Sequence, residues 1–226
     1  ERVSKMYERD LDGQKLPNAN IMLLGGRENG VVDAIKHAII SHKGRKKILV
    51  VSRETDLDQT VDEHDGAIVS KPDELDSEKD LQLIHPQEVN LESLDKIFST
   101  VSPEGKKLVV IDDSVLGERE LSGGQKPRMD LEKTRQLIQH SKDKGFDIAL
   151  ASSRVPGVSI IKELGGEFPI KAVFKSEDIS AEADSLTPLG YRSADYLQYV
   201  KLGGGECKID YPHARDPHLP FKVKKI

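Results

Sequence analysis

The sequence predicts an α/β fold with a mostly parallel central sheet, and three observations support this. Short apolar runs alternate along the chain with longer amphipathic segments, which is the pattern of βαβ units. Most of the runs end in a glycine or a polar residue, as buried parallel strands do. The length of 226 residues is sufficient for one α/β domain with a buried core.

The expected strands and helices follow from these runs and from their spacing. We expect strands at 21–24, 48–52, 67–69, 108–111, 148–151 and 172–174, and a C-terminal β-hairpin made by 199–202 and 207–211. Helices are expected at 31–42, 91–101, 130–141 and 159–164, where apolar residues recur at helical spacing. The first helix is expected to bury Val32, Ile35, Ala38 and Ile39. Acidic side chains crowd residues 54–80, which we interpret as a solvated surface with helix N-caps.

Composition excludes several classes of protein. With 34 Lys and Arg against 39 Asp and Glu, the net charge of −5 argues against a surface built to bind nucleic acid. A single cysteine excludes an intramolecular disulfide and a thiolate metal site. The longest apolar runs, 48–51 and 108–111, are too short to span a bilayer. The chain begins at Glu1 rather than Met, so we expect a piece of a longer protein.

The first candidate site is a glycine loop between the strand at 21–24 and the helix at 31–42. Its residues are Gly25, Gly26, Arg27, Glu28, Asn29, Gly30, Val31 and Val32. A phosphate-binding P-loop has the same two glycines at the same separation, followed by Lys and Ser or Thr. Val31 and Val32 replace the lysine that would reach the phosphates and the hydroxyl that would bind Mg²⁺, and Glu28 adds a negative charge to the loop. The backbone amides and the helix N-terminus still favour an anion.

Two further candidates follow expected strands. Asp112 and Asp113 end the strand at 108–111, where a P-loop ATPase places the Mg²⁺ aspartate and the acid that orients the attacking water. Ser153 and Arg154 follow the strand at 148–151, where a polar group senses a γ-phosphate. Carboxyl ends of parallel strands are the usual ligand edge of such a sheet.

Two other features are interpreted as coincidences. Residues 121–125 spell the signature of ABC transporters, but here they follow the acid-tipped strand instead of preceding it. His213 and His218 lie near Cys207 in sequence, and we expect no metal site there.

The segments Ile21–Ile35, Leu108–Asp113, Phe146–Pro156 and Phe168–Lys175 resemble, in order and spacing, the motor core of FtsK/SpoIIIE-type ATPases. Gly203–Gly205 is similar to the glycine-rich hairpin of that family. The resemblance implies a three-layer RecA-like P-loop ATPase fold over residues 20–211, with a lead-in at 1–19 and a tail at 212–226. The degenerate loop is most similar to C-terminal modules of the type VII secretion coupling proteins of the EssC/EccC group.

On this resemblance, Gly25 and Gly30 match the P-loop glycines, Asp112 the Mg²⁺ ligand, Asp113 a vestigial catalytic acid and Arg154 the arginine after the sensor. ATP and Mg²⁺ are the cofactors that it implies. Since Val31 and Val32 depart from the pattern, we expect no efficient hydrolysis by this module, although the parent protein would be an ATPase.

The resemblance also implies partners and a location. The partners are neighbouring ATPase modules of the same chain, secreted protein substrates and a hexamer of the full-length protein. The location is the cytoplasmic side of a membrane-anchored protein involved in virulence. Three alternatives stay open at this point. They are a module that still binds ATP, a DNA translocase subunit, and a flavodoxin- or receiver-like domain with an acidic pocket at Asp112 and Asp113.

Overall fold

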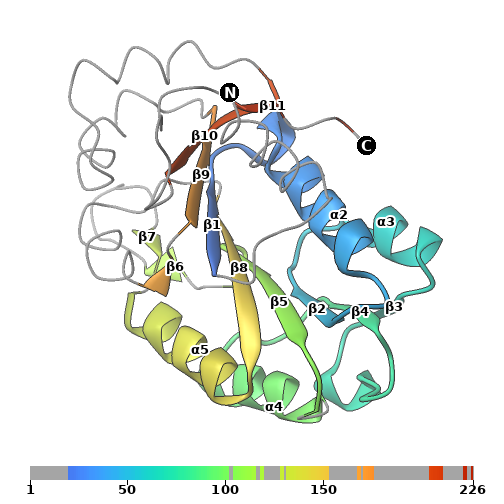
Figure 1. The fold of residues 1–226 in the computed structure, drawn as a ribbon. Helices are drawn as coiled ribbons and strands as arrows, with labels where there is room; N and C mark the ends of the chain where they lie inside the picture. The colour runs from blue at the N-terminus through green and yellow to red at the C-terminus, as the bar shows by residue number, and fades with distance from the viewer. Residues whose placement is uncertain are drawn as a thin grey trace. The chain divides into compact units, whose positions relative to one another are not determined.

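The computed structural model confirms an α/β fold with a mostly parallel sheet (Figure 1). It describes residues 20–101, 104–115, 118–119, 128–129, 131–152, 167–168, 170–175, 204–210, 221–222 and 225. The chain divides into two compact units, Glu1–Ser41 with Ala151–Ile226 (unit 1) and His42–Leu150 (unit 2). None of the helices in these described ranges combines the length and apolar character that a bilayer crossing needs.

Unit 1 contains a parallel strand pair extended by antiparallel strands. Its strands β1 (Ile21–Leu24), β9 (Ile170–Phe174), β10 (Glu206–Asp210) and β11 (Phe221–Lys222) lie in the order β11-β10-β9-β1. β1 pairs with β9 in parallel, whereas β10 is antiparallel to both β9 and β11. The strand expected at 207–211 is therefore present as β10, and the other half of the expected hairpin, 199–202, lies outside the described residues.

The helix of unit 1, α2 (Val31–His42), follows a single turn of 3₁₀ helix, η1 (Arg27–Asn29). Apolar residues at helical spacing are buried along α2, but the buried residue of its first turn is Val31 rather than Val32. The prediction that Val32 belongs to the core face was wrong. Val31 stands three, four, seven and eight residues before the other buried apolar residues of α2, Ala34, Ile35, Ala38 and Ile39, so it lies on their face of the helix and Val32 lies beside it.

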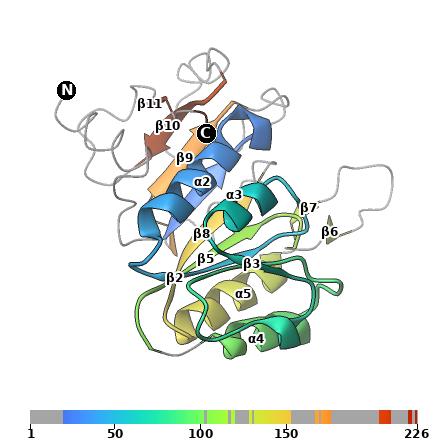
Figure 2. The ribbon, with the colours of Figure 1, turned by 90° about the vertical axis from the view of Figure 1, so that its right-hand side faces the viewer.

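Unit 2 is a layered α/β structure. Its strands are β2 (Lys47–Val51), β3 (Ala67–Val69), β4 (Leu81–Ile84), β5 (Lys107–Asp112) and most of β8 (Phe146–Ser152), in the order β8-β5-β2-β4-β3. β2 pairs in parallel with β4 and β5, and β3 pairs in parallel with β4. The helices α4 (Leu91–Thr100) and α5 (Leu131–Asp143) lie side by side on one face of these strands, and α3 (Asp58–Glu63) lies on the other (Figure 2).

The core of unit 2 forms where these helices meet the strands. Phe98 of α4 is completely buried and packs edge-on against Phe146 of β8, with ring centroids 5.6 Å apart. Burying a side chain of this size contributes about 2–3 kcal/mol. His140 Nδ1 bonds Asp95 Oδ1 at 2.8 Å and joins α5 to α4 on the solvent side.

Two elements of unit 2 were not predicted from the sequence. Helix α3 lies in the acidic region 54–80 that we interpreted as a solvated surface, and strand β4 follows directly after that region. A short helix at Asp73 after Pro72 is expected from the sequence, and the structure has the 3₁₀ helix η2 (Pro72–Glu74) there. Gln82 interrupts the apolar run of β4, yet it is buried, because its side-chain amide accepts from the backbone amide of Asp76 at 2.8 Å and donates to the Asp76 carbonyl at 2.7 Å. The short antiparallel ladder of β6 (Glu118–Arg119) with β7 (Arg128–Met129) was also not predicted.

Candidate functional site

The glycine loop of unit 1 connects β1 to α2 and is held tightly by its neighbours. Gly25 has φ of 132°, and a Cβ there would lie 2.8 Å from the carbonyl oxygen of Phe174. A Cβ on Gly30 would lie 2.8 Å from the Phe174 ring and 3.0 Å from Cα of Gly205. Both glycines are thus required by backbone conformation and by close packing against β9 and the start of β10. Neither requirement involves a phosphate.

Backbone hydrogen bonds close this loop further. The amide of Gly25 donates to the Ser152 carbonyl at 2.9 Å, and that of Gly26 donates to the Lys175 carbonyl at 3.0 Å. The Asn29 amide donates back to the Gly26 carbonyl at 3.0 Å and so forms the 3₁₀ turn. An anion-binding loop needs amides that point at the ligand. Three amides of this loop instead bond the protein's own carbonyls.

Side chains of the loop also lie close to its own backbone. Asn29 Nδ2 and Glu28 Oε1 lie so close to Gly26 that a Cβ there would meet them at 2.6 and 2.8 Å. Val31, at the position of the phosphate-binding lysine, has no exposed surface. Val32, at the position of the Mg²⁺-binding hydroxyl, is half-buried and apolar. The loop therefore lacks both cationic and hydroxyl groups at these two positions, and it carries a carboxylate near its backbone.

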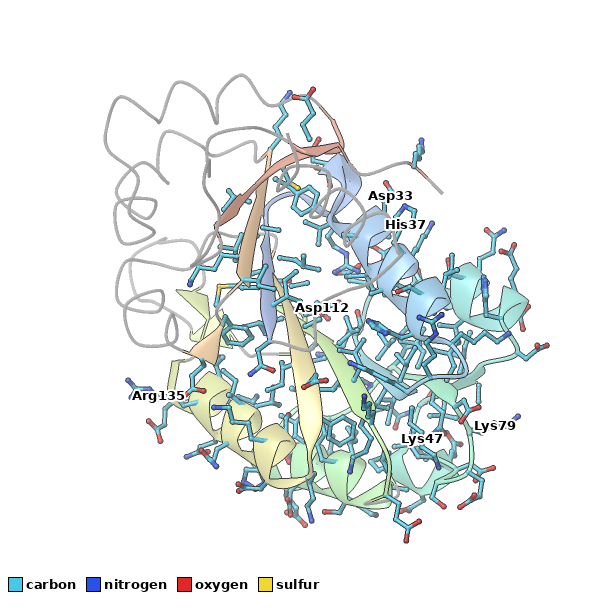
Figure 3. All side chains as sticks on the ribbon, viewed as in Figure 1. Asp33, His37, Lys47, Lys79, Asp112 and Arg135 are labelled. Atoms are coloured by element: carbon cyan, nitrogen blue, oxygen red, sulfur yellow. The ribbon has the colours of Figure 1, made fainter. Side chains whose placement is uncertain are left out.

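Asp112 ends β5 of unit 2, with its side chain 2% exposed (Figure 3). Its Oδ2 accepts a hydrogen bond from Oγ of Ser52, and its Oδ1 accepts from both the amide of Ser114, at 3.0 Å, and Oγ of Ser114. The Ser114 hydroxyl also accepts from the Arg53 amide at 2.8 Å. Both carboxylate oxygens therefore accept hydrogen bonds from protein donors that directly follow β2 and β5.

A second set of contacts lies at the carboxyl ends of the strands of unit 2, near Asp112, and was not predicted from the sequence. His85, directly after β4, donates from Nδ1 to the Ser52 carbonyl at 2.6 Å, and its Nε2 lies 2.8 Å from Oδ1 of Asp58. Asp58 begins α3. Ser52, His85 and Asp58 come from three separate segments, so no local pattern could indicate their contact. Only the parallel order of β2 and β4 brings them together.

The remaining predicted residues divide between described and undescribed parts of the chain. Asp113 is half-buried beside Asp112. Ser153, Arg154, residues 121–125, His213 and His218 lie outside the described residues. Cys207 is buried, and burial raises the pKa of its thiol far above the ordinary value, as expected for an unreactive core cysteine. Among the residues that the structure describes, no group of three His, Cys, Asp or Glu side chains is placed to hold a metal ion.

Magnesium and a nucleoside triphosphate do not fit the described residues well. The loop of unit 1 presents no lysine or hydroxyl at the two positions that would bind them, and in unit 2 the oxygens of Asp112 already accept from Ser52 and Ser114.

Comparison with known proteins extends this description. No family model matches the chain, and no curated protein matches it in sequence. Solved structures do match. The genome packaging NTPase B204 from Sulfolobus turreted icosahedral virus 2, in complex with AMPPCP, is 14% identical with a TM-score of 0.60, and the match covers 93% of this chain and 99% of that one. VirB4 of Thermoanaerobacter pseudethanolicus is 9% identical with a TM-score of 0.60, covering 92% of this chain and 90% of that one.

The chain has the fold of a P-loop ATPase. A further match is the cytoplasmic domain of the Thermomonospora curvata type VII secretion ATPase EccC, at 10% identity and a TM-score of 0.54. That match covers 92% of this chain but 25% of EccC, so the chain is similar in size to one part of that larger domain. These identities show the fold alone, and the P-loop ATPase fold agrees with the one that the sequence resemblance implies.

Proposed function

We propose that this chain is a catalytically impaired module of a secretion motor, with a role in assembly, regulation or recognition of secreted protein substrates. The observation that carries the proposal is the complete burial of Val31, at the position after the second loop glycine. A lysine at that position makes a charge-assisted contact to phosphate worth about 1.5–3 kcal/mol. An apolar side chain packed into the core supplies none of it.

The finer assignment is to the type VII secretion coupling proteins of the EssC/EccC group, in a full-length protein that is membrane-anchored and hexameric. Its support is the resemblance of the sequence to that group together with the fold match to part of EccC. The sequence encoded upstream of Glu1 tests this assignment. A second P-loop that retains Lys and Ser or Thr would agree with a tandem arrangement of modules, and an upstream region without one would contradict it.

The absence of ATP turnover is tested directly on the chain. We expect no appreciable ATPase activity and no change of melting temperature with millimolar Mg-ATP. A ligand that binds the folded state raises the melting temperature, so an unchanged value indicates that Mg-ATP does not bind. An Asp113→Asn variant is the control, since any trace activity from a contaminating enzyme will persist in it. Turnover that Asp113→Asn abolishes would contradict the proposal. A thermal shift without turnover would favour the alternative of a nucleotide-binding module.

A further inference from the structure

Three loops at the amino ends of β2, β5 and β8 gather basic side chains on one edge of unit 2. In the sequence these residues form separate short runs at 43–47, 104–107 and 142–147, and each alone is an ordinary solvated loop. Together the three segments carry eight basic side chains and three acidic ones, Glu104, Asp143 and Asp147. The basic ones, which we name the amino-edge cluster, are Lys43, Arg45, Lys46, Lys47, Lys106, Lys107, Lys142 and Lys144.

Hydrogen bonds and a salt bridge hold these three segments against one another. Lys47 is the register partner of Lys107 in the parallel pair of β2 and β5, and its amide donates to the Lys106 carbonyl at 2.9 Å. Nζ of Lys107 donates to the Lys144 carbonyl and lies 5.1 Å from the centre of the Phe146 ring. The segment at 43–47 is joined to β8 by the pair of Lys46 Nζ with Asp147 Oδ2, at 3.0 Å. The cluster is therefore one surface made by three loops.

The eight basic side chains of the cluster outnumber the three acids of the same segments. Lys46 Nζ pairs with Asp147, and the Lys43 ammonium lies 3.4 Å from the carboxylate of Asp65, which belongs to another loop. Arg45, Lys106 and Lys144 are exposed. The positive charges of the cluster also act on two buried side chains, His42 and Lys107. Burial and then the charges of Lys46 and Arg45 lower the pKa of His42 to about 4, although Asp147 opposes them. Burial, Lys144 and Lys47 lower the pKa of Lys107.

We propose that the amino-edge cluster is a docking surface for a short acidic segment of a partner protein. The inference goes beyond the proposed function, because the cluster lies at the amino ends of the strands and Asp112 at the carboxyl end of β5. The loop before β4 borders the cluster where Nζ of Lys47 donates to the Ser77 carbonyl, and its residues 76–80 carry three acids, Asp76, Glu78 and Asp80, against one lysine, Lys79. Those acids would repel a polyanion that continues past the cluster, whereas a short acidic segment needs only the cluster itself.

Two other partners are disfavoured by the same surface. Single-stranded nucleic acid binds on exposed aromatic side chains, and the aromatic ring in these segments, Phe146, is buried. A peripheral membrane site usually adds apolar side chains to its basic ones. Among the described residues, the large apolar side chains that are exposed are Ile40 and Ile68, and neither belongs to these three loops.

The test uses the full 226-residue chain and a fluorescent oligoglutamate peptide, with binding followed by anisotropy over a range of salt concentrations. We expect binding at low salt that weakens as salt rises, since exposed charges are screened. The double variant Lys106→Glu/Lys144→Glu should bind at least about tenfold more weakly. The matched control Arg53→Glu/Lys71→Glu changes net charge equally at the carboxyl ends of β2 and β3, and should bind within about twofold of the unchanged chain.

Several results would overturn the inference. One is no peptide binding at low salt, and another is equal weakening in both double variants, which would indicate net charge rather than this surface. Circular dichroism and the melting temperature establish that both variants fold. Duplex DNA and phosphatidylglycerol vesicles are run in parallel. If either binds more tightly than the peptide and Lys106→Glu/Lys144→Glu abolishes that binding, the surface belongs to nucleic acid or membrane and the assignment to a protein partner is wrong.

Discussion

The glycine loop of unit 1 and the Asp112 strand end of unit 2 differ in which residues stand at the positions that a P-loop ATPase uses. At the loop, Val31 and Val32 stand where that pattern has Lys and Ser or Thr. At the strand end an acid is present, and serine hydroxyls bond its oxygens. The difference teaches that the two positions are held by different forces. Val31 is held by apolar packing, whereas Asp112 is held by hydrogen bonds whose loss would leave donors unpaired.

The largest expected effect concerns the loop, and the substitution is Gly25→Ala. Its Cβ would lie 2.8 Å from a backbone oxygen of Phe174 at a φ of 132°, so strain and overlap add. We expect a loss of about 4 kcal/mol in unfolding free energy, measured by urea denaturation. The control is Gly44→Ala, which also has positive φ but open space around it, and should lose about 1 kcal/mol. Similar losses in the two variants would contradict the close packing of the loop.

The next largest effect concerns the strand end, and the substitution is Asp112→Ala. Three donors lose their acceptor inside the protein, so we expect a loss of about 3 kcal/mol in unfolding free energy. The same change at the half-buried Asp113 should lose about 1 kcal/mol or less. Equal losses at the two positions would show that Asp112 has no special structural role. Added Mg²⁺ should change neither value.

His42 is a buried titratable residue outside both candidate sites, so its effect on stability can be compared with the effects at those sites. Burial and then the charges of Lys46 and Arg45 lower its pKa from 6.5 to about 4, against an opposing contribution from Asp147. Between these values the unfolded chain binds the proton and the folded one does not, so stability is full above pH 6.5 and falls as the pH is lowered towards 4. We expect about 2 kcal/mol of loss by about pH 5. In urea denaturation at several pH values, the unfolding free energy of His42→Gln should not show this dependence on pH. An unchanged dependence in the variant would show that His42 is not its cause.

The smallest expected effect is that of Ser52→Ala, which removes one of the donors to Asp112 and the acceptor of the Glu54 amide. Because Ser114 still bonds Asp112, we expect a loss of about 1 kcal/mol in unfolding free energy. In the double variant with Asp112→Ala, the loss should be smaller than the sum of the two single losses, since both changes break the same contact. Strict additivity in a double-mutant cycle would show that the two side chains do not interact.

Much of the fold could be predicted from the sequence because the core strands are apolar runs. The runs at 21–24 and 108–111 need no partner to be recognised, since their burial follows from their composition. Strand β4 could not be recognised in this way. Gln82 is tolerated inside only because the backbone of Asp76 satisfies its amide, and that contact depends on the path of the acidic loop in three dimensions.

In the candidate site, too, local features could be predicted and long-range contacts could not. Gly25, Gly30 and Asp112 were predicted as site residues from spacing and from their places after apolar strands. The bonds of Asp112 to Ser52 and of His85 to Asp58 were not, because each joins residues from segments far apart in the chain. The grouping of the basic side chains of the amino-edge cluster likewise depends on the order of the strands in the sheet. The three short basic segments of the sequence do not indicate that order.

The sequence by itself determined the α/β class and the apolar pair Val31 and Val32 after Gly30, because both follow from residue type and local spacing. Tertiary structure decided which contacts the glycine loop, Asp112 and the basic loops make. It closed the glycine loop onto the carbonyls of Ser152 and Lys175, gave Asp112 its serine partners, and gathered three lysine-bearing loops on one edge. These outcomes depend on parallel strand pairing, which brings the ends of distant segments within hydrogen-bonding distance.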